Sequence, residues 1–149
     1  GREEEMAIAY AMWTHGHSIQ IEYPERLSKV ERKGFSARLT SPGAGQPNWL
    51  HFAVPTPGIV NGSRLRVGSV LVRFKCGQAS IKAIHVYDGE NKIAAKDNLS
   101  LCPKQWHAER LDLPGKPEVL WGVGISVLVD FGPDDRWVEF SSAGCAFFS

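Results

Sequence analysis

Residues 118–131, which read EVLWGVGISVLVDF, constrain the fold of this chain more than any other segment. Large apolar residues occupy the odd-numbered positions, whereas the even positions include Gly122, Gly124 and Ser126. A repeat of two residues is typical of a β-strand, and glycines in mid-run disfavour a helix. The segment therefore predicts a long strand over Val119–Phe131, with a small-residue face that leaves room for a neighbouring layer or a ligand.

Short runs rich in Val, Ile, Phe and Trp recur along the chain between 9 prolines and 15 glycines. This spacing is typical of all-β folds. The length of 149 residues predicts a single antiparallel β-sandwich, with a jelly roll as one form that it can take, and a core that needs no metal or disulfide. Strands are expected at Ala7–Trp13, His17–Tyr23, Gly34–Thr40, Trp49–Val54, Ser69–Lys75, Ser80–Tyr87, Lys92–Lys96, His107–Leu113, Val119–Phe131 and Trp137–Phe147.

Alternation also assigns the two faces of individual strands. In residues 48–54 the apolar triplet Leu50, Phe52 and Val54 predicts a core face, which turns Trp49 and His51 outward.

Residues 81–87 allow two such assignments. One puts Ile84 and Val86 in the core and turns His85 and Tyr87 outward. The other puts positions 81 and 83 in the core, and the sequence does not decide between them.

Residues 1–5 are interpreted as an expression remnant or flexible tail, and residues 6–149 as one domain. The 17 basic and 16 acidic residues form no long run of one sign, so neither a nucleic acid nor a membrane is expected as a partner. No segment has the apolar length of a transmembrane helix, and no signal peptide is visible. We therefore expect a soluble, cytoplasmic protein, although a signal removed by cleavage would leave the same sequence.

The cysteines Cys76, Cys102 and Cys145 are widely separated and form no CxxC pair. Two interpretations stay open: three reduced thiols, or one disulfide with one free thiol. Cys145 shares the odd-numbered face with Phe147, which indicates a core position.

Tryptophan and histidine occur together three times. In two of the pairs they are two residues apart, so a strand would place an indole and an imidazole side by side on one face. An indole can cover the apolar C–H surface of a sugar while an imidazole fixes its orientation. The alternative is that the indoles cap the sandwich edges and the histidines bond loop carbonyls. The pairs are Trp13 with His15, Trp49 with His51, and Trp106 with His107.

His15, Gly16 and His17, followed by Glu22, resemble the first half of the cupin metal motif, which implies a divalent metal. The glycine before that motif and its second half are missing, and His17 and Glu22 have opposite parity. The alternative is an HxH that bonds its own loop. A looser metal hypothesis uses His15, His51 and His85 as three ligands from three strands. No metal is assigned, and the cofactor stays unknown.

Nucleophilic catalysis has little support, because the chain contains no GxSxG, HExxH or phosphate-binding glycine motif. Asp88 follows His85 and Tyr87 at the end of an expected strand. It predicts an Asx-type turn, and the alternative is a polar site that moves protons on a carbonyl compound.

Four segments resemble those of small microbial proteins that carry a domain of unknown function. That resemblance implies one β-sandwich domain and supplies no activity, substrate or catalytic residue. The segments are MAIAYAMWTHG from Met6, NWLHFAVPTP from Asn48, IHVYDG from Ile84 and WGVGISVLVDF from Trp121.

The favoured function is a soluble module that binds a small molecule or glycan on a face decorated with Trp and His. One alternative is a small enzyme, namely an isomerase, a cyclase or a metal-dependent lyase with histidine chemistry. Another is a structural protein that self-associates, because an exposed edge strand can pair with a second copy. The candidate ligand-binding residues are Trp13, His15, Trp49, His51, His85, Tyr87 and Trp106.

Overall fold

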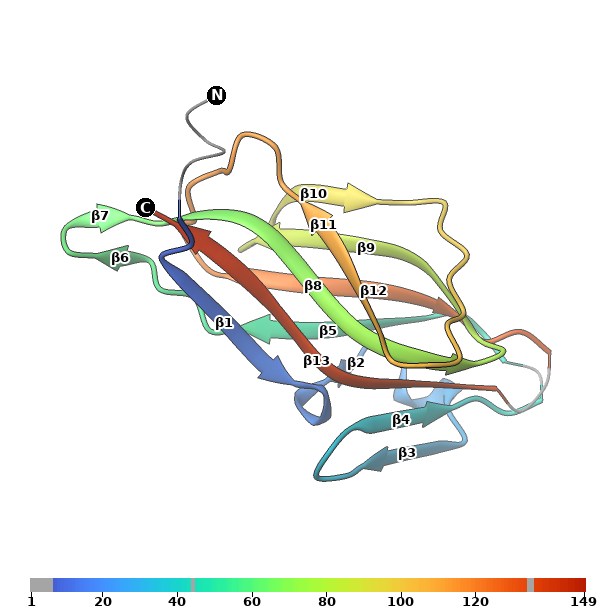
Figure 1. The fold of residues 1–149 in the computed structure, drawn as a ribbon. Coiled ribbons are helices and arrows are strands. Elements are labelled where there is room, and N and C mark those ends of the chain that lie inside the picture. Colours follow the sequence, from blue (N-terminus) through green and yellow to red (C-terminus); the bar gives the residue numbers. More distant parts are fainter. Residues whose placement is uncertain (1–6, 44, 134–135) are drawn as a thin grey trace.

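The computed structural model describes residues 7–43, 45–133 and 136–149, so the tail predicted at residues 1–5 lies outside the described residues. Two antiparallel sheets pack face to face (Figure 1), and no α-helix occurs in the described ranges. The structure confirms the predicted antiparallel β-sandwich. No helix among these residues has the length and apolar character that crossing a membrane requires.

The first sheet has two long central strands. It is formed by β1 (Tyr10–His15), β3 (Lys29–Arg32), β4 (Ala37–Thr40), β8 (Arg66–Gly77), β11 (His107–Asp112) and β13 (Trp137–Phe148). The order is β11-β8-β13-β4-β3, and β1 also pairs with β13. The last strand of the chain therefore joins three others.

The second sheet is the other layer in Figure 1. It is formed by β2 (Gln20–Ile21), β5 (Asn48–Val54), β9 (Ser80–Asp88), β10 (Asn91–Lys96) and β12 (Val123–Asp130), in the order β10-β9-β12-β5-β2. The β6 (Ile59–Val60) and β7 (Ser63–Arg64) strands form a separate hairpin. Two 3-10 turns are η2 (Gly16–Ser18) and η3 (Pro24–Arg26).

Aromatic rings from both sheets meet in the core. Phe52 on β5 and Phe140 on β13 have ring centroids 5.6 Å apart at 60°, and Phe74 on β8 lies 6.1 Å from Phe140. All three side chains are at most 1% exposed. Burying a side chain of this size stabilises a fold by about 1.5–3 kcal/mol, so this contact holds the layers together.

The predicted faces of β5 are confirmed, because Leu50, Phe52 and Val54 are buried while Trp49 and His51 are not. In β9 both open assignments prove partly right. A register shift against β12 lets Ile81 share the core with Ile84 and Val86 although their parity differs. A bulge inserts one residue and so reverses the alternation.

Several predicted strand bounds are wrong. The strand expected over Val119–Phe131 begins only at Val123, and His17–Tyr23 is mostly η2 and loop with the two-residue β2. The first strand starts at Tyr10 and not at Ala7. Three strands, β3, β6 and β7, were not expected at all.

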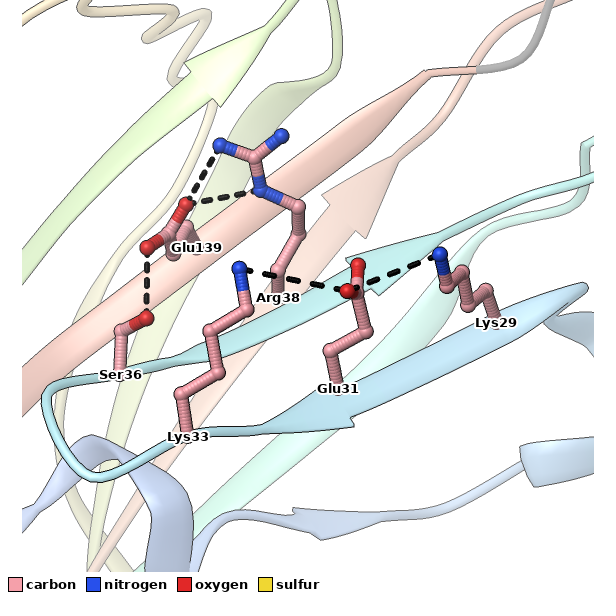
Figure 2. Close-up of polar contacts among 6 residues, drawn as sticks. All are labelled: Lys29, Glu31, Lys33, Ser36, Arg38 and Glu139. Carbon is pink, nitrogen blue, oxygen red and sulfur yellow. Dashed lines mark hydrogen bonds and ion pairs between the residues drawn. The ribbon is translucent and has the colours of Figure 1, made fainter.

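Glu139 is a buried carboxylate on the outer side of the first sheet. Figure 2 shows it between Ser36 and Arg38: the Ser36 hydroxyl donates at 2.5 Å and the Arg38 Nε at 2.8 Å. The Arg38 guanidinium also lies 3.7 Å above the Trp137 ring. Burial alone would raise the pKa of Glu139, but the hydrogen bonds from Ser36 and Arg38 lower it below its ordinary value. The carboxylate is therefore ionised at neutral pH.

The cysteines are all free in the structure. Cys76 and Cys145 are buried, which raises the pKa of each thiol to about 12, and Cys145 confirms its predicted core position. Cys102 is exposed, and its proximity adds to the burial of Cys76 in raising the pKa of the Cys76 thiol.

Candidate functional site

Three polar side chains form a row across the outer face of the second sheet. Ser126 on β12 lies opposite His51 on β5 and opposite His85 on β9. The neighbouring residues Ile125 and Val127 are fully buried, so alternation points Ser126 away from the core. We call these three residues the His51–Ser126–His85 row.

Each imidazole of the row is held by a carboxylate. The Nε2 atom of His51 lies 2.8 Å from Oε1 of Glu22, and its Nδ1 atom lies 2.7 Å from Oγ of Ser126. The Nε2 atom of His85 lies 2.7 Å from Oδ1 of Asp97. The hydrogen bond with His51 lowers the pKa of Glu22 below its ordinary value. Both rings are thus oriented before any ligand binds.

Two aromatic side chains stand beside the row. The Trp49 indole packs against the His85 ring, with centroids 5.0 Å apart and planes tilted by 48°. Tyr87 lies opposite Gly124 in the strand register and is half-buried. An aromatic surface next to fixed hydrogen-bonding groups suits a sugar or another small ligand with polar edges.

The surface is hollowed around the row. A hollow of ≈ 480 Å³ extends over Gly122 and Gly124, and its lining includes His51, Ser126 and Tyr87. The glycines place no side chain in this space, so the small-residue face predicted from the sequence does leave room beside the strand. A neighbouring hollow of ≈ 340 Å³ is lined by Glu22, Trp49, His51, His85, Tyr87, Lys92 and Ser126.

Trp121 packs against Gly89, which lines the larger hollow, and Asp88 fixes the loop that carries Trp121. The Asp88 carboxylate is 4% exposed and accepts the backbone N–H groups of Leu120, Trp121 and Gly122 at 2.9, 2.8 and 3.1 Å. Burial alone would raise the pKa of Asp88, but these three hydrogen bonds lower it below its ordinary value. Asp88 therefore binds a distant loop in place of the local Asx turn that was expected.

The structure brings together four of the seven predicted ligand-binding residues: Trp49, His51, His85 and Tyr87. Trp13 and His15 lie on β1 of the other sheet, and Trp106 precedes β11 there. The two pairs spaced by two residues do each share one face of a strand, as predicted. They are on opposite layers of the sandwich and do not meet.

The three-histidine metal hypothesis is wrong for the same reason, since His15 and the pair His51 and His85 belong to different sheets. The cupin-like arrangement is also not formed. His15 Nδ1 accepts the backbone N–H of His17 at 3.1 Å, and Glu22 bonds His51. No group of three or more His, Cys, Asp or Glu residues suited to a metal ion was found in the described ranges.

Three residues of this face were not among the predicted site residues. Ser126 was recognised only as a small residue, Glu22 only as a partner for the HxH, and Trp121 only as one of the large apolar residues at odd-numbered positions. The alternation in β12 does identify Ser126 as outward. Nothing local in the sequence indicates that Asp88 holds Trp121 at the surface.

The fold and this face define a β-sandwich with a polar and aromatic surface on its second sheet. The chain belongs to the family of unknown function DUF6623, whose sequence model matches residues 8–146. No curated protein matches it.

Solved structures of similar fold include a low-affinity xylan binding module, CBM86, from the xylanolytic gut symbiont Roseburia intestinalis. The TM-score is 0.55 at 14% identity, and the match covers 93% of this chain and 96% of that chain. A variant of CBM29-2, a family 29 carbohydrate binding module, complexed with cellulohexaose, has a TM-score of 0.52 at 8% identity, covering 93% and 92%. At these identities the likeness establishes the fold alone.

Proposed function

We propose that the protein binds a glycan on the outer face of its second sheet. The observation that carries this proposal is the convergence of Trp49 and Tyr87 on the His51–Ser126–His85 row, around an open hollow. The rings supply apolar surface for sugar C–H groups, while the row supplies oriented donors and acceptors for hydroxyls.

The charges on this face favour a neutral ligand. Each histidine of the row already has a carboxylate partner, Glu22 or Asp97. A charged ligand would have to displace one member of these pairs, whereas a sugar hydroxyl can both donate to a carboxylate and accept from an imidazole. The solved structures of similar fold support the same class, because one is a xylan binding module and another is a carbohydrate binding module complexed with cellulohexaose.

The test is calorimetric titration with xylohexaose and cellohexaose. We expect measurable binding of at least one, and a loss of about tenfold or more in Trp49→Ala and in His51→Ala, because each substitution removes a contact group. Phe35→Ala is the matched control. The Phe35 side chain is 63% exposed, and it lies in the β3–β4 hairpin of the first sheet, whereas the row lies on the second sheet. Equal binding by wild type, Trp49→Ala and His51→Ala would contradict the proposal.

A second candidate, an enzyme that uses acid–base chemistry, is favoured by one observation. Glu22, His51 and Ser126 form a continuous series of hydrogen bonds, the order in which a carboxylate, an imidazole and a hydroxyl act in hydrolases. Against it, β12 lies between β5 and β9 and pairs with both, so its backbone N–H groups are not available to stabilise an oxyanion.

Product analysis separates the two candidates. Mass spectrometry of oligosaccharides incubated with wild type and with Ser126→Ala would reveal new products only in the wild-type sample if the enzyme reading holds. Elemental analysis of untagged protein and of His51→Ala tests the metal-dependent form of that reading. Self-association stays a prediction, which light scattering across a dilution series tests.

A further inference from the structure

A second aromatic surface lies on the outer face of the first sheet. Trp13 on β1 is opposite Gly144 on β13, which is opposite Leu71 on β8. One row along, His15, Ser142 and Arg73 are aligned in the same way. On β8, Leu71 and Arg73 lie between the buried residues Val70, Val72 and Phe74, so this side of the sheet faces outward. A hollow of ≈ 250 Å³ is lined by Trp13, Leu71, Arg73, Ala108 and Ser142.

The indole of Trp13 is a fixed and accessible platform. It covers Gly144 so closely that a Cβ atom added there would overlap the ring. The side chain is nevertheless 51% exposed. A large aromatic surface that is already positioned loses little conformational entropy when a ligand stacks on it.

The same surface carries the positive charges of Lys75, which lies opposite Glu139 in the strand register, and of Arg73, which pairs with no carboxylate of the described residues. The Arg73 guanidinium lies 4.9 Å and the Lys75 ammonium 4.8 Å from the ring centroid of Trp106. Arg73 donates a hydrogen bond to the Ser141 hydroxyl at 3.0 Å, and neither cation forms a salt bridge with any residue that the structure describes. The nearby carboxylate of Glu139 is engaged by Ser36 and Arg38.

We propose that this surface, formed by Trp13, Leu71, Arg73, Lys75, Trp106 and Ser142, is a second glycan site that takes an acidic polysaccharide bearing uronate groups. Trp13 stacks on a sugar ring, and Arg73 and Lys75 bind the carboxylates. A guanidinium can form two parallel hydrogen bonds with one carboxylate, and a neutral sugar has no carboxylate to accept them. Three strand spacings separate β1 from β11, about 14 Å, so the site accepts a run of sugar units and not one alone.

The charge pattern separates this site from the one on the second sheet. There each histidine has a carboxylate partner, whereas here Arg73 has none among the described residues and Lys75 lies opposite a carboxylate that Ser36 and Arg38 already engage. Uronate binding should therefore weaken as salt is added, because exposed charges are screened. The inference goes beyond the function proposed above and does not depend on it.

The test is calorimetric titration of the full chain with oligogalacturonate, with its methyl ester as the uncharged counterpart, and with oligoglucuronate. We expect binding of at least one uronate oligomer, about tenfold weaker binding in Trp13→Ala and in the double variant Arg73→Ala/Lys75→Ala, and weaker binding of the ester. Lys29→Ala is the matched control, since Lys29 is a cation of the same sheet that pairs with Glu31 on β3, at the edge opposite β11.

Trp49→Ala distinguishes the two sites, because it should weaken xylohexaose or cellohexaose binding and leave uronate binding unchanged. If neither uronate oligomer binds, if the ester binds equally well, or if Trp49→Ala removes uronate binding, the second site is wrong. Thermal unfolding of each variant confirms that the fold is kept, and Arg73→Glu, a change at an exposed side chain, repeats the charge test independently of Trp13.

Discussion

The carboxylate of Asp88 accepts the backbone N–H of Trp121 at 2.8 Å, although the two residues are 33 positions apart. Together with the adjacent bonds from Leu120 and Gly122, this contact holds residues 120–122 in a loop, so β12 begins only at Val123. It also leaves the Trp121 indole 74% exposed, beside Gly89, which lines the larger hollow.

Replacing Asp88 by alanine should destabilise the protein by about 2 kcal/mol, because three backbone donors lose a charged acceptor. Urea unfolding at neutral pH measures this change. Asp112→Ala is the control, since that carboxylate is 68% exposed in a surface pair and should change stability by less than about 0.5 kcal/mol. Equal effects of the two substitutions would show that the loop contact does not stabilise the fold.

The same contact predicts a dependence on pH. The pKa of Asp88 is lower in the folded protein than in the unfolded chain, so ionised Asp88 stabilises the fold above the unfolded value of about 4. This stabilisation is lost as the pH falls through the lowered folded pKa. We expect wild type to be more stable than Asp88→Asn at pH 7, and the difference to shrink towards pH 2. A difference that stayed constant over this range would contradict the assignment.

Glu139 and Glu31 form ion pairs in the same region (Figure 2) but differ in burial. Glu139 is 2% exposed and holds both Ser36 and Arg38, so Glu139→Ala should cost about 2 kcal/mol by leaving those donors without an acceptor. Glu31 is 28% exposed, with Lys29 at 3.6 Å and Lys33 at 4.0 Å, and Glu31→Ala should cost less than about 0.5 kcal/mol. Chemical unfolding of the two variants checks this ranking, and the reverse order would refute it.

The neighbouring thiols of Cys76 and Cys102 should form a disulfide under a strong oxidant. The raised pKa of Cys76, about 12, makes its thiolate scarce, so we expect the disulfide to form slowly in the absence of a strong oxidant. The closed loop should stabilise the oxidised protein by about 3 kcal/mol. Peptide mapping of wild type, Cys102→Ala and Cys145→Ala checks the pairing. The Cys76–Cys102 bond should form in wild type and in Cys145→Ala, and no disulfide should form within Cys102→Ala. A Cys76–Cys145 bond in wild type or in Cys102→Ala would contradict the predicted pairing.

Local alternation was enough to predict the strands that form the centre of the sandwich. The Asn48–Val54 strand alternates without interruption, and its faces follow directly from the sequence. The β3 strand was missed because Lys29–Arg32 contains a single apolar residue and lies at the sheet edge. The start of the strand predicted over Val119–Phe131 was misplaced, because Asp88, a residue distant in sequence, holds the loop that contains Trp121.

The site was predictable only in part for a related reason. Alternation predicts that Trp13 and His15 share one face of their strand, and that Trp49 and His51 share one face of theirs. It does not predict which sheet each strand joins. That assignment comes from pairing partners far apart in the chain, such as β1 with β13 and β5 with β12. The four residues that converge could not be separated from the other three on the sequence alone.

The placement of Trp13 and Trp49 on the outer faces of opposite layers has a further consequence. Packed sheets are about 10 Å apart, and the core between them contains no passage for a polymer. A glycan strand on one surface is therefore separated from the other surface by the full thickness of the sandwich. Occupying both surfaces would join two separate strands through a single small protein, so a mixture of neutral and acidic polysaccharides would become cross-linked in proportion to the protein added.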